Sequence, residues 1–327
     1  MIMKKFAVTA LCLLLSFSTA ALSACTDGGS SSSGSSSSGK PDDHEIIECL
    51  TDPDFERGFT VRGLDSATDS GVCKTVKFGD ESPAWTVAQW WSKNNLKDGE
   101  ENITETDYSL KDESKKIAIN RKYHSITLAL DGSKEFDNYN VIAPAKWPHL
   151  LIEQSVNNVT LVDAEKVEAK LDFTLTANED LRGGNGVGLQ AQFAWFIYIV
   201  DKNPESEGFG NFLWFGLNIF DSTKLYAPAS SQQDTAGGLG NYIYALGANE
   251  FMQNRVKVNA NNSFSFDILP SVKKGIAAAQ ANGFMQGTKI DDCVITGMNI
   301  GWEVFDRWNE SITIFDISIA KTVKEIA

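Results

Sequence analysis

The stretch Phe193–Asp221 reads FAWFIYIV (193–200), DKNPESEGFG (201–210) and NFLWFGLNIFD (211–221). The two outer segments are apolar and have the length of strands, whereas the middle segment is polar and carries the Asn, Pro and Gly residues typical of a loop. We therefore predict two strands joined by a polar loop, and we expect the rest of the chain to be organised around them.

The second of these strands has two different faces, because successive side chains of a strand point to opposite sides. One face is apolar throughout and is expected to be core. The other combines aromatic rings with a glycine and an amide, which is typical of a sheet face that meets a flat polar ligand such as a sugar. We predict that Trp214 and Asn218 contact this ligand, and that Gln190 and Gln192 extend the same face from the preceding strand.

The surrounding sequence predicts an all-β fold. Val167–Thr176 alternates apolar and polar residues, as half-buried strands of antiparallel sheets do. Neither a second linker nor an internal repeat interrupts residues 44–327, so we expect one domain there, a two-sheet antiparallel β-sandwich of the jelly-roll type. Its N-terminal portion, 44–115, is expected to be irregular. One short helix is predicted at 270–282, and a bulge is predicted at 314–315, where the apolar phase changes.

The first 25 residues predict export. Lys4 and Lys5 precede an apolar run, and Leu22-Ser23-Ala24-Cys25 resembles the lipobox of bacterial lipoproteins. This resemblance implies a lipid on Cys25, with residues 1–25 as signal segment, and a plain signal peptide is the alternative. The apolar run is shorter than the roughly 20 residues that a membrane-spanning helix needs. Because Thr26, and not aspartate, follows the cysteine, we expect the outer membrane or cell surface of a Gram-negative bacterium. The Ser/Gly-rich residues 26–43 are a flexible linker.

Charge and composition exclude several classes of partner. The formal net charge is −14 and becomes more negative when Lys4 and Lys5 are removed. Nucleic acids and other anionic polymers gain nothing from an acidic surface, whereas neutral polysaccharide carries no such penalty. The chain has three histidines, none at ligand spacing to another. We expect no metal, no cofactor and no nucleic-acid partner, membrane contact through the lipid alone, and a monomer.

Three cysteines follow the expected anchor. Cys49 and Cys73 bracket a turn-rich segment, and in an exported protein they are a reasonable disulfide. Cys293 would then be a buried thiol. A pairing that involves Cys293 stays open.

Two glutamates are the candidates for chemistry. In Met298–Val304, the residues Asn299, Gly301 and Glu303 alternate with an apolar face, and Glu153 is the only charge in Leu150–Val156. Hydrolysis of a glycosidic bond needs two carboxyl groups that flank it. We predict Glu303 and Glu153 as this pair, with Asp221 as an alternate and Asn299 as a further binding residue. The simpler alternatives are an ion pair of Glu303 with an arginine such as Arg307, and a rim position for Glu153.

Three runs carry a resemblance: WPHLLIEQ (147–154), NFLWFGLNIFD (211–221) and GMNIGWEV (297–304). They resemble a family of bacterial jelly-roll proteins and, more loosely, are similar to concanavalin-like carbohydrate-active proteins, including small endoglucanases and xylanases with two glutamates in a concave cleft. The resemblance implies a glycoside hydrolase acting on a neutral plant or microbial polysaccharide. Residues 211–221 contain no glutamate, however. A non-catalytic glycan-binding lipoprotein and an adhesive or structural β-sandwich are the alternatives, and the length of the chain favours the hydrolase.

Overall fold

The computed structural model describes residues 44–64, 71–136, 146–183, 189–234 and 241–324. The predicted signal segment 1–25 with Cys25, and the linker 26–43, lie outside the described residues. The chain divides into two units at residue 43, and every described residue belongs to the second unit, Asp43–Ala327.

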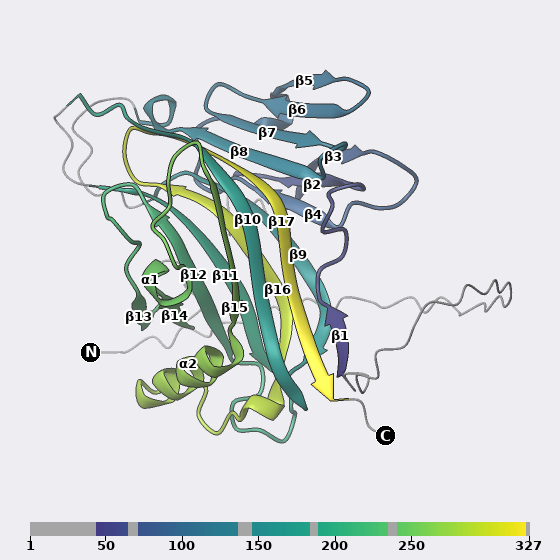
Figure 1. The fold of residues 1–327 in the computed structure, drawn as a ribbon, viewed down its shortest axis with the longest axis vertical. Coiled ribbons are helices and arrows are strands. Elements are labelled where there is room, and N and C mark those ends of the chain that lie inside the picture. Colours follow the sequence, from purple (N-terminus) through teal and green to yellow (C-terminus); the bar gives the residue numbers. More distant parts are fainter. Residues whose placement is uncertain (1–43, 65–70, 137–145, 184–188, 235–240, 325–327) are drawn as a thin grey trace, which may run out of the picture. The chain divides into compact units, whose positions relative to one another are not determined.

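The described strands form two sheets (Figure 1). Sheet A has the order β15-β10-β17-β8-β7-β6-β5, with β1 paired to β17. Its strands are β1 (His44–Glu48), β5 (Glu100–Ile103), β6 (Asp107–Lys111), β7 (Lys115–Asn120), β8 (Ser125–Asp131), β10 (Ala164–Asp180), β15 (Asn261–Asp267) and β17 (Trp308–Lys324). Sheet B has the order β13-β14-β12-β11-β16-β9-β4-β2-β3. Its strands are β2 (Gly58–Arg62), β3 (Val72–Lys77), β4 (Trp85–Ala88), β9 (His149–Thr160), β11 (Ala191–Asp201), β12 (Phe212–Asp221), β13 (Ser230–Gln233), β14 (Tyr242–Leu246) and β16 (Cys293–Val304).

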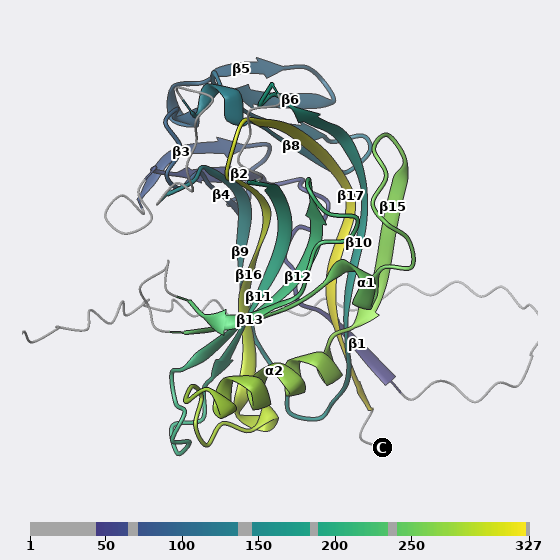
Figure 2. The same cartoon turned by 90° about the vertical axis from the view of Figure 1, so that its left-hand side faces the viewer.

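The all-β, two-sheet jelly-roll sandwich predicted from the sequence is confirmed. Seen from the side in Figure 2, β9, β16, β11 and β12 form one curved layer, and β10, β17 and β15 form the other. The central hairpin is β11–β12, paired antiparallel as predicted. Two pairs, β12–β14 and β2–β4, are parallel, so the sheets are not antiparallel throughout. Parallel neighbours need a long connection, and residues 222–241 provide one for β12 and β14.

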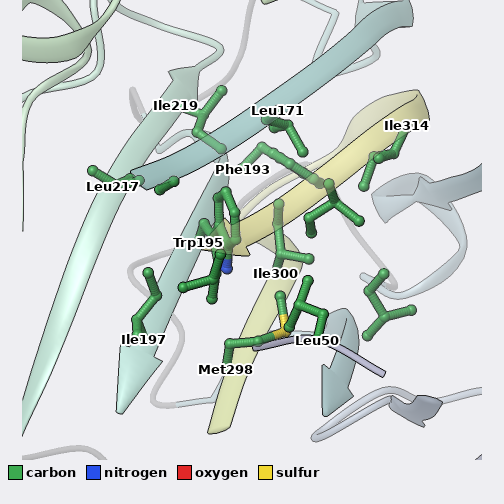
Figure 3. Close-up of a cluster of buried hydrophobic side chains, with 14 of the residues drawn as sticks. Leu50, Leu171, Phe193, Trp195, Ile197, Leu217, Ile219, Met298, Ile300 and Ile314 are labelled. Carbon is green, nitrogen blue, oxygen red and sulfur yellow. The ribbon is translucent and has the colours of Figure 1, made fainter. Parts of the chain in front are cut away.

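The core lies between the two layers. Alternate residues of β11, β12 and β16, such as Trp195, Leu217 and Ile300, meet Leu171 of β10 and Ile314 of β17 (Figure 3), and all five are fully buried. These are the faces that the period-two pattern marks as apolar. Because sheet B buries this face, its opposite face is the one available to a ligand.

One helix of several turns is present among the described residues, as predicted. It is α2 (Leu269–Ala281), with Pro270 in its first turn and Val272, Ile276 and Ala279 buried. It packs against β12 and β14 of sheet B and touches β10 of sheet A, so it covers an edge of the core. The other helical pieces are single turns: α1 (Ala248–Phe251), η1 (Leu96–Asp98), η2 (Gly132–Lys134) and η3 (Ile290–Asp292).

Two further expectations concern regularity. The predicted bulge is confirmed, because the pairing of β17 with β10 shifts between Asp316 and Ile314 and leaves Phe315 as the extra residue. Residues 44–115 are more regular than predicted, since β1 to β6 lie within them and join both sheets. Their strands have only four to six residues, which is too short for a clear alternation in the sequence.

The predicted disulfide between Cys49 and Cys73 is wrong. The amide of Cys49 donates to Ile319 of β17 in sheet A, whereas Cys73 lies in β3, the last strand of sheet B. Cys49 is instead a buried free thiol, and burial raises its pKa to about 12. Cys293 is likewise a buried free thiol at the start of β16, which also removes the alternative pairing.

Candidate functional site

A cleft of about 490 Å³ lies on the face of sheet B that points away from the core. Its size is within the range usual for small-molecule sites. Seven residues that the sequence marks as candidates line it together: Gln190, Gln192, Trp214, Asn218, Asp221, Asn299 and Glu303. The structure therefore brings these candidates from three strands and one adjoining loop to one place.

The register of the strands puts two carboxyl groups on this face, one on either side of Gln192. Gln192 of β11 pairs with Glu303 of β16 on one side and with Asp221 of β12 on the other. Directly paired residues of neighbouring strands share a face, and each strand adds about 4.8 Å. The backbones of Asp221 and Glu303 are therefore about 10 Å apart, with Gln192 between them.

A bulge decides the direction of Asp221. Simple alternation puts Asp221 on the core face together with Ile219. In the structure, Phe193 pairs with Phe220 and Ala194 pairs with Asn218, so Ile219 is the extra residue in β12. The bulge exchanges the faces beyond it, and Asp221 thereby enters the cleft. Its Oδ1 accepts hydrogen bonds of 2.7 Å from both the backbone and the hydroxyl of Thr223.

Glu303 is held by neighbours within the cleft. Its Oε2 accepts a hydrogen bond of 3.1 Å from Trp147 Nε1 and one of 3.0 Å from Gln192 Nε2. His149 Nε2 lies 3.7 Å from its Oε1. Burial lowers the pKa of His149, against the opposing effect of Glu303, so a neutral imidazole is the neighbour of this carboxylate. The expected alternative, an ion pair with Arg307, is not the arrangement found, because Arg307 donates to the Phe136 carbonyl.

Aromatic rings surround the carboxylate end of the cleft. Trp147 stacks on Phe305 with ring centroids 4.5 Å apart, and Trp91 meets Trp147 edge to face at 5.7 Å. Trp90 and Trp91 both contact the ring of His149. No role was predicted from the sequence for Trp147, His149 or Phe305. The available signal was the Trp147-Pro148-His149 run at the start of β9, because Trp and His each carry a polar group that needs a partner.

Trp90 and Trp91 both line the cleft, although the alternation of a strand would separate them. The strand β4 ends at Ala88, before either residue. Trp91 then adopts a left-handed backbone conformation, with φ of 56°. Because Trp90 and Trp91 follow the end of the strand, strand alternation no longer places their rings on opposite faces.

Trp214 sits at the other end of the cleft within a group of rings. It makes edge-to-face contacts with Tyr198, Phe196 and Phe212, at centroid distances of 4.6, 6.0 and 5.5 Å. Gly216 next to it is required by packing, because a Cβ there would lie 2.7 Å from the Phe196 ring and 2.6 Å from Ala245 Cβ. The glycine of this face therefore makes room for an aromatic side chain and not for a ligand.

The two amides of the cleft floor are fixed by local hydrogen bonds. Asn218 Nδ2 donates to the Pro228 carbonyl over 2.7 Å, and Asn299 Nδ2 donates to the Tyr198 hydroxyl over 2.8 Å. Each amide keeps its oxygen available as an acceptor for a hydroxyl donor. These are the preorganised polar groups that a sugar site requires.

Glu153 lies apart from the cleft. It pairs with Asn299, whereas Glu303 pairs with His149, so four residues of strand, about 13 Å, separate the two positions along the sheet. Its carboxylate is 3.3 Å from Arg62 Nε, and it does not line the cleft. Burial raises the pKa of Glu153, and Arg62 offsets part of this effect.

The arrangement is an aromatic-lined cleft whose floor holds amides and two carboxyl groups. Within the described ranges, no group of three His, Cys, Asp or Glu side chains is placed to hold a metal ion. No helix of the described chain is both long and apolar enough to cross a membrane. The arrangement is a cleft on a β-sandwich in which aromatic rings and a few fixed polar groups face the same space.

No protein-family model matches this chain, and no curated protein matches it. Solved structures similar to it include the endoglucanase cel12A from Rhodothermus marinus, with 11% identity over 69% of this chain and 96% of that one, at a TM-score of 0.35. The family 12 xyloglucanase from Bacillus licheniformis has 9% identity over 70% and 99%, at 0.39. The xyloglucanase domain of NopAA from Sinorhizobium fredii, in complex with cellobiose, has 9% identity over 68% and 97%, at 0.37. Likenesses at this level assign no activity.

Proposed function

We propose that this protein binds a neutral polysaccharide in the cleft of sheet B and hydrolyses its glycosidic bonds. The observation that carries the proposal is the register of Gln192, which sets Asp221 and Glu303 on one face, two strands apart. Glycosidases use carboxyl groups about 5 to 9.5 Å apart. Because side chains on one face of a sheet stand roughly perpendicular to it, backbones about 10 Å apart place the two carboxyl groups near the upper end of this range.

In this proposal Glu303 and Asp221 are the catalytic pair, one as acid/base and the other as nucleophile or base, in either order. Glu153, the partner that the sequence favours, is replaced by the alternate residue because it lies about 13 Å further along the strand and pairs with Arg62. Trp214 offers a ring for stacking on a pyranose, and Gln190, Gln192, Asn218 and Asn299 offer hydrogen bonds to hydroxyl groups.

The test uses the domain 44–327 with a panel of neutral β-glucans, xylans and mannans, and measures both reducing ends and retention on the polymer. We expect Glu303→Gln and Asp221→Asn to lower the release of reducing ends at least about 100-fold, with retention kept. Glu153→Gln is the matched control and should leave release unchanged. Trp214→Ala should weaken retention. If no glycan of the panel is retained or cleaved, the proposal fails.

A specific observation favours a second candidate, glycan binding without hydrolysis. Both carboxyl groups are already engaged, Glu303 by Trp147 and Gln192 and Asp221 by Thr223. A carboxylate that mainly holds its neighbours in place is suited to shaping a binding floor. Retention on a glycan without any release of reducing ends, and loss of retention in Trp214→Ala, would decide for this candidate.

We also propose that the chain is anchored to a membrane by a lipid on Cys25, on the basis of the lipobox-like sequence. Cys25→Ala should move the expressed protein from the membrane fraction to the soluble fraction. It should also stop the incorporation of labelled palmitate. Unchanged fractionation and no label on the parent protein would contradict the anchor.

A further inference from the structure

A second pocket, here called the side pocket, adjoins the cleft. It has a volume of about 330 Å³ and lies between the segment 222–227, which follows β12, and the segment 255–258, which precedes β15. Phe220, Asp221 and Ala227 line both the side pocket and the cleft. The two spaces therefore share a wall that contains one of the proposed catalytic residues.

The side pocket is rich in positive charge, although the chain as a whole has a formal charge of −14. Lys224, Arg255 and Lys257 line it, and all three are exposed. None of the three makes an ion pair with a described residue, whereas Arg57, Lys74 and Arg182 on other surfaces each have a carboxylate within 2.8 Å. Three cations around one pocket, without partners in the described chain, provide a site for an anion.

The uncharged polar groups of the side pocket are also donors. Asn178 brings a side-chain amide. Ser222 Oγ accepts a hydrogen bond of 2.8 Å from the Ala191 amide, which leaves its own proton to donate. Among the described lining residues the only carboxylate is Asp221, and its Oδ1 is occupied by Thr223. The pocket thus presents donors to a ligand that brings acceptors.

We propose that the side pocket binds the carboxylate of a uronic acid that branches from the glycan in the cleft. This inference rests on the proposed function, because it assigns a substituent to the polysaccharide bound there. A carboxylate matches a guanidinium with two parallel hydrogen bonds, which Arg255 can supply, while Lys224 and Lys257 add charge. Among the described lining residues, Lys and Arg occur in the side pocket and not in the cleft. A neutral backbone is therefore compatible with the acidic cleft, and an anionic branch would find its positive charge in the side pocket.

The experiment titrates the domain 44–327 with glucuronic acid, glucose and inorganic sulfate and follows binding by NMR chemical shifts. We expect glucuronate to bind, more weakly as salt is raised, and glucose not to bind at the side pocket. The double variant Arg255→Gln/Lys257→Gln should weaken glucuronate binding about tenfold. The matched control is Lys273→Gln/Lys274→Gln, which removes two exposed lysines from α2 and should leave glucuronate binding unchanged.

The outcomes separate this inference from the proposed function. Glucuronate that fails to bind, or that binds equally well to the double variant, overturns the inference even when neutral glycans are retained in the cleft. Sulfate that binds as tightly as glucuronate also overturns it, because the site then recognises charge and not the sugar acid. Binding of glucuronate with no retention of any polymer supports the side pocket and defeats the proposed function. A branched polymer that carries glucuronate should be retained more tightly than its unbranched backbone, and the difference should vanish in the double variant.

Discussion

At the scale of single residues, Glu310 is the side chain with the most unusual environment. It lies on the core face of β17, paired with Leu130 of β8 and Asn178 of β10, and it is fully buried. Neither of its oxygens, nor Asn178 Oδ1, has a hydrogen-bond partner among the described residues. Burial, assisted by Glu179, raises the pKa of Glu310 to about 9. The carboxyl group is therefore protonated at neutral pH.

This environment predicts a loss of stability toward alkaline pH. The unfolded state releases the proton near its ordinary pKa of 4.5, whereas the folded state keeps it up to about 9. The contribution is complete below 4.5 and is lost as pH rises from there, by up to about 1.4 kcal/mol per unit. Glu310→Gln stays neutral and should flatten this slope in denaturant unfolding between pH 5 and 9. The control variant Glu165→Gln, at an exposed position, should leave the slope unchanged. Parallel curves for Glu310→Gln and the parent would contradict the assignment.

At the scale of elements, the segment with Trp90 and Trp91 depends on a buried ionic cluster and not on a sheet. Glu135, just after η2, accepts from the Lys93 amide at 2.5 Å and from the Ser92 hydroxyl at 2.7 Å. Lys115 of β7 donates to the Asn94 carbonyl at 2.7 Å. Lys115 is fully buried, and Glu135 nearly so. A carboxylate that follows η2 and an ammonium from β7 of sheet A thus hold the aromatic rim of a cleft on sheet B.

Removal of Glu135 from this cluster should be costly, because the Lys93 amide and the Ser92 hydroxyl lose a buried acceptor. Lys115 keeps Asp112 as an ion-pair partner at 2.8 Å. We expect Glu135→Ala to lower the free energy of unfolding by about 1–3 kcal/mol and to increase hydrogen exchange in residues 90–95. Glu165→Ala breaks the exposed pair with His44 and should cost less than about 1 kcal/mol. An equal loss of unfolding free energy in the two variants, measured in urea, would show that the cluster does not hold the segment with Trp90 and Trp91 in place.

At the scale of the whole described unit, the two sheets are joined through their core. Trp302 of β16 in sheet B is fully buried and donates a hydrogen bond of 3.0 Å to the Leu128 carbonyl of β8 in sheet A. Its ring also contacts Phe193 and Phe220. Because the two sheets share one core, which this side chain helps to join, we expect them to unfold in a single event.

We expect Trp302→Phe to lower the free energy of unfolding by about 1–3 kcal/mol, because the Leu128 carbonyl loses a buried donor and the smaller ring leaves space. Circular dichroism and fluorescence should still report a single coincident transition. Phe315→Leu, at the exposed bulge of β17, should have little effect. Separate transitions for the two probes in the parent protein would contradict the coupling of the sheets.

Much of the sandwich and part of the cleft followed from local pattern. The period of two put Gln192, Trp214, Asn218 and Glu303 on the face of their strands that lines the cleft before any pairing was known, because alternation is a property of each strand by itself. The bulge at Phe315 was visible for the same reason, as a change of phase. The pairing of Cys49 with Cys73 was wrong, since distance along the chain does not tell which sheet each strand joins.

The sequence by itself thus determined the fold class, the helix, and the face of the central hairpin that lines the cleft, since all three depend on periodicities within short segments. Only the tertiary structure decided which carboxyl groups meet. The register brought Asp221 and Glu303 to either side of Gln192, and the bulge at Ile219 turned Asp221 into the cleft. Glu153 forms an ion pair with Arg62 outside the cleft. Register and bulges arise from pairing between strands that are far apart in the chain, so no single segment encodes them.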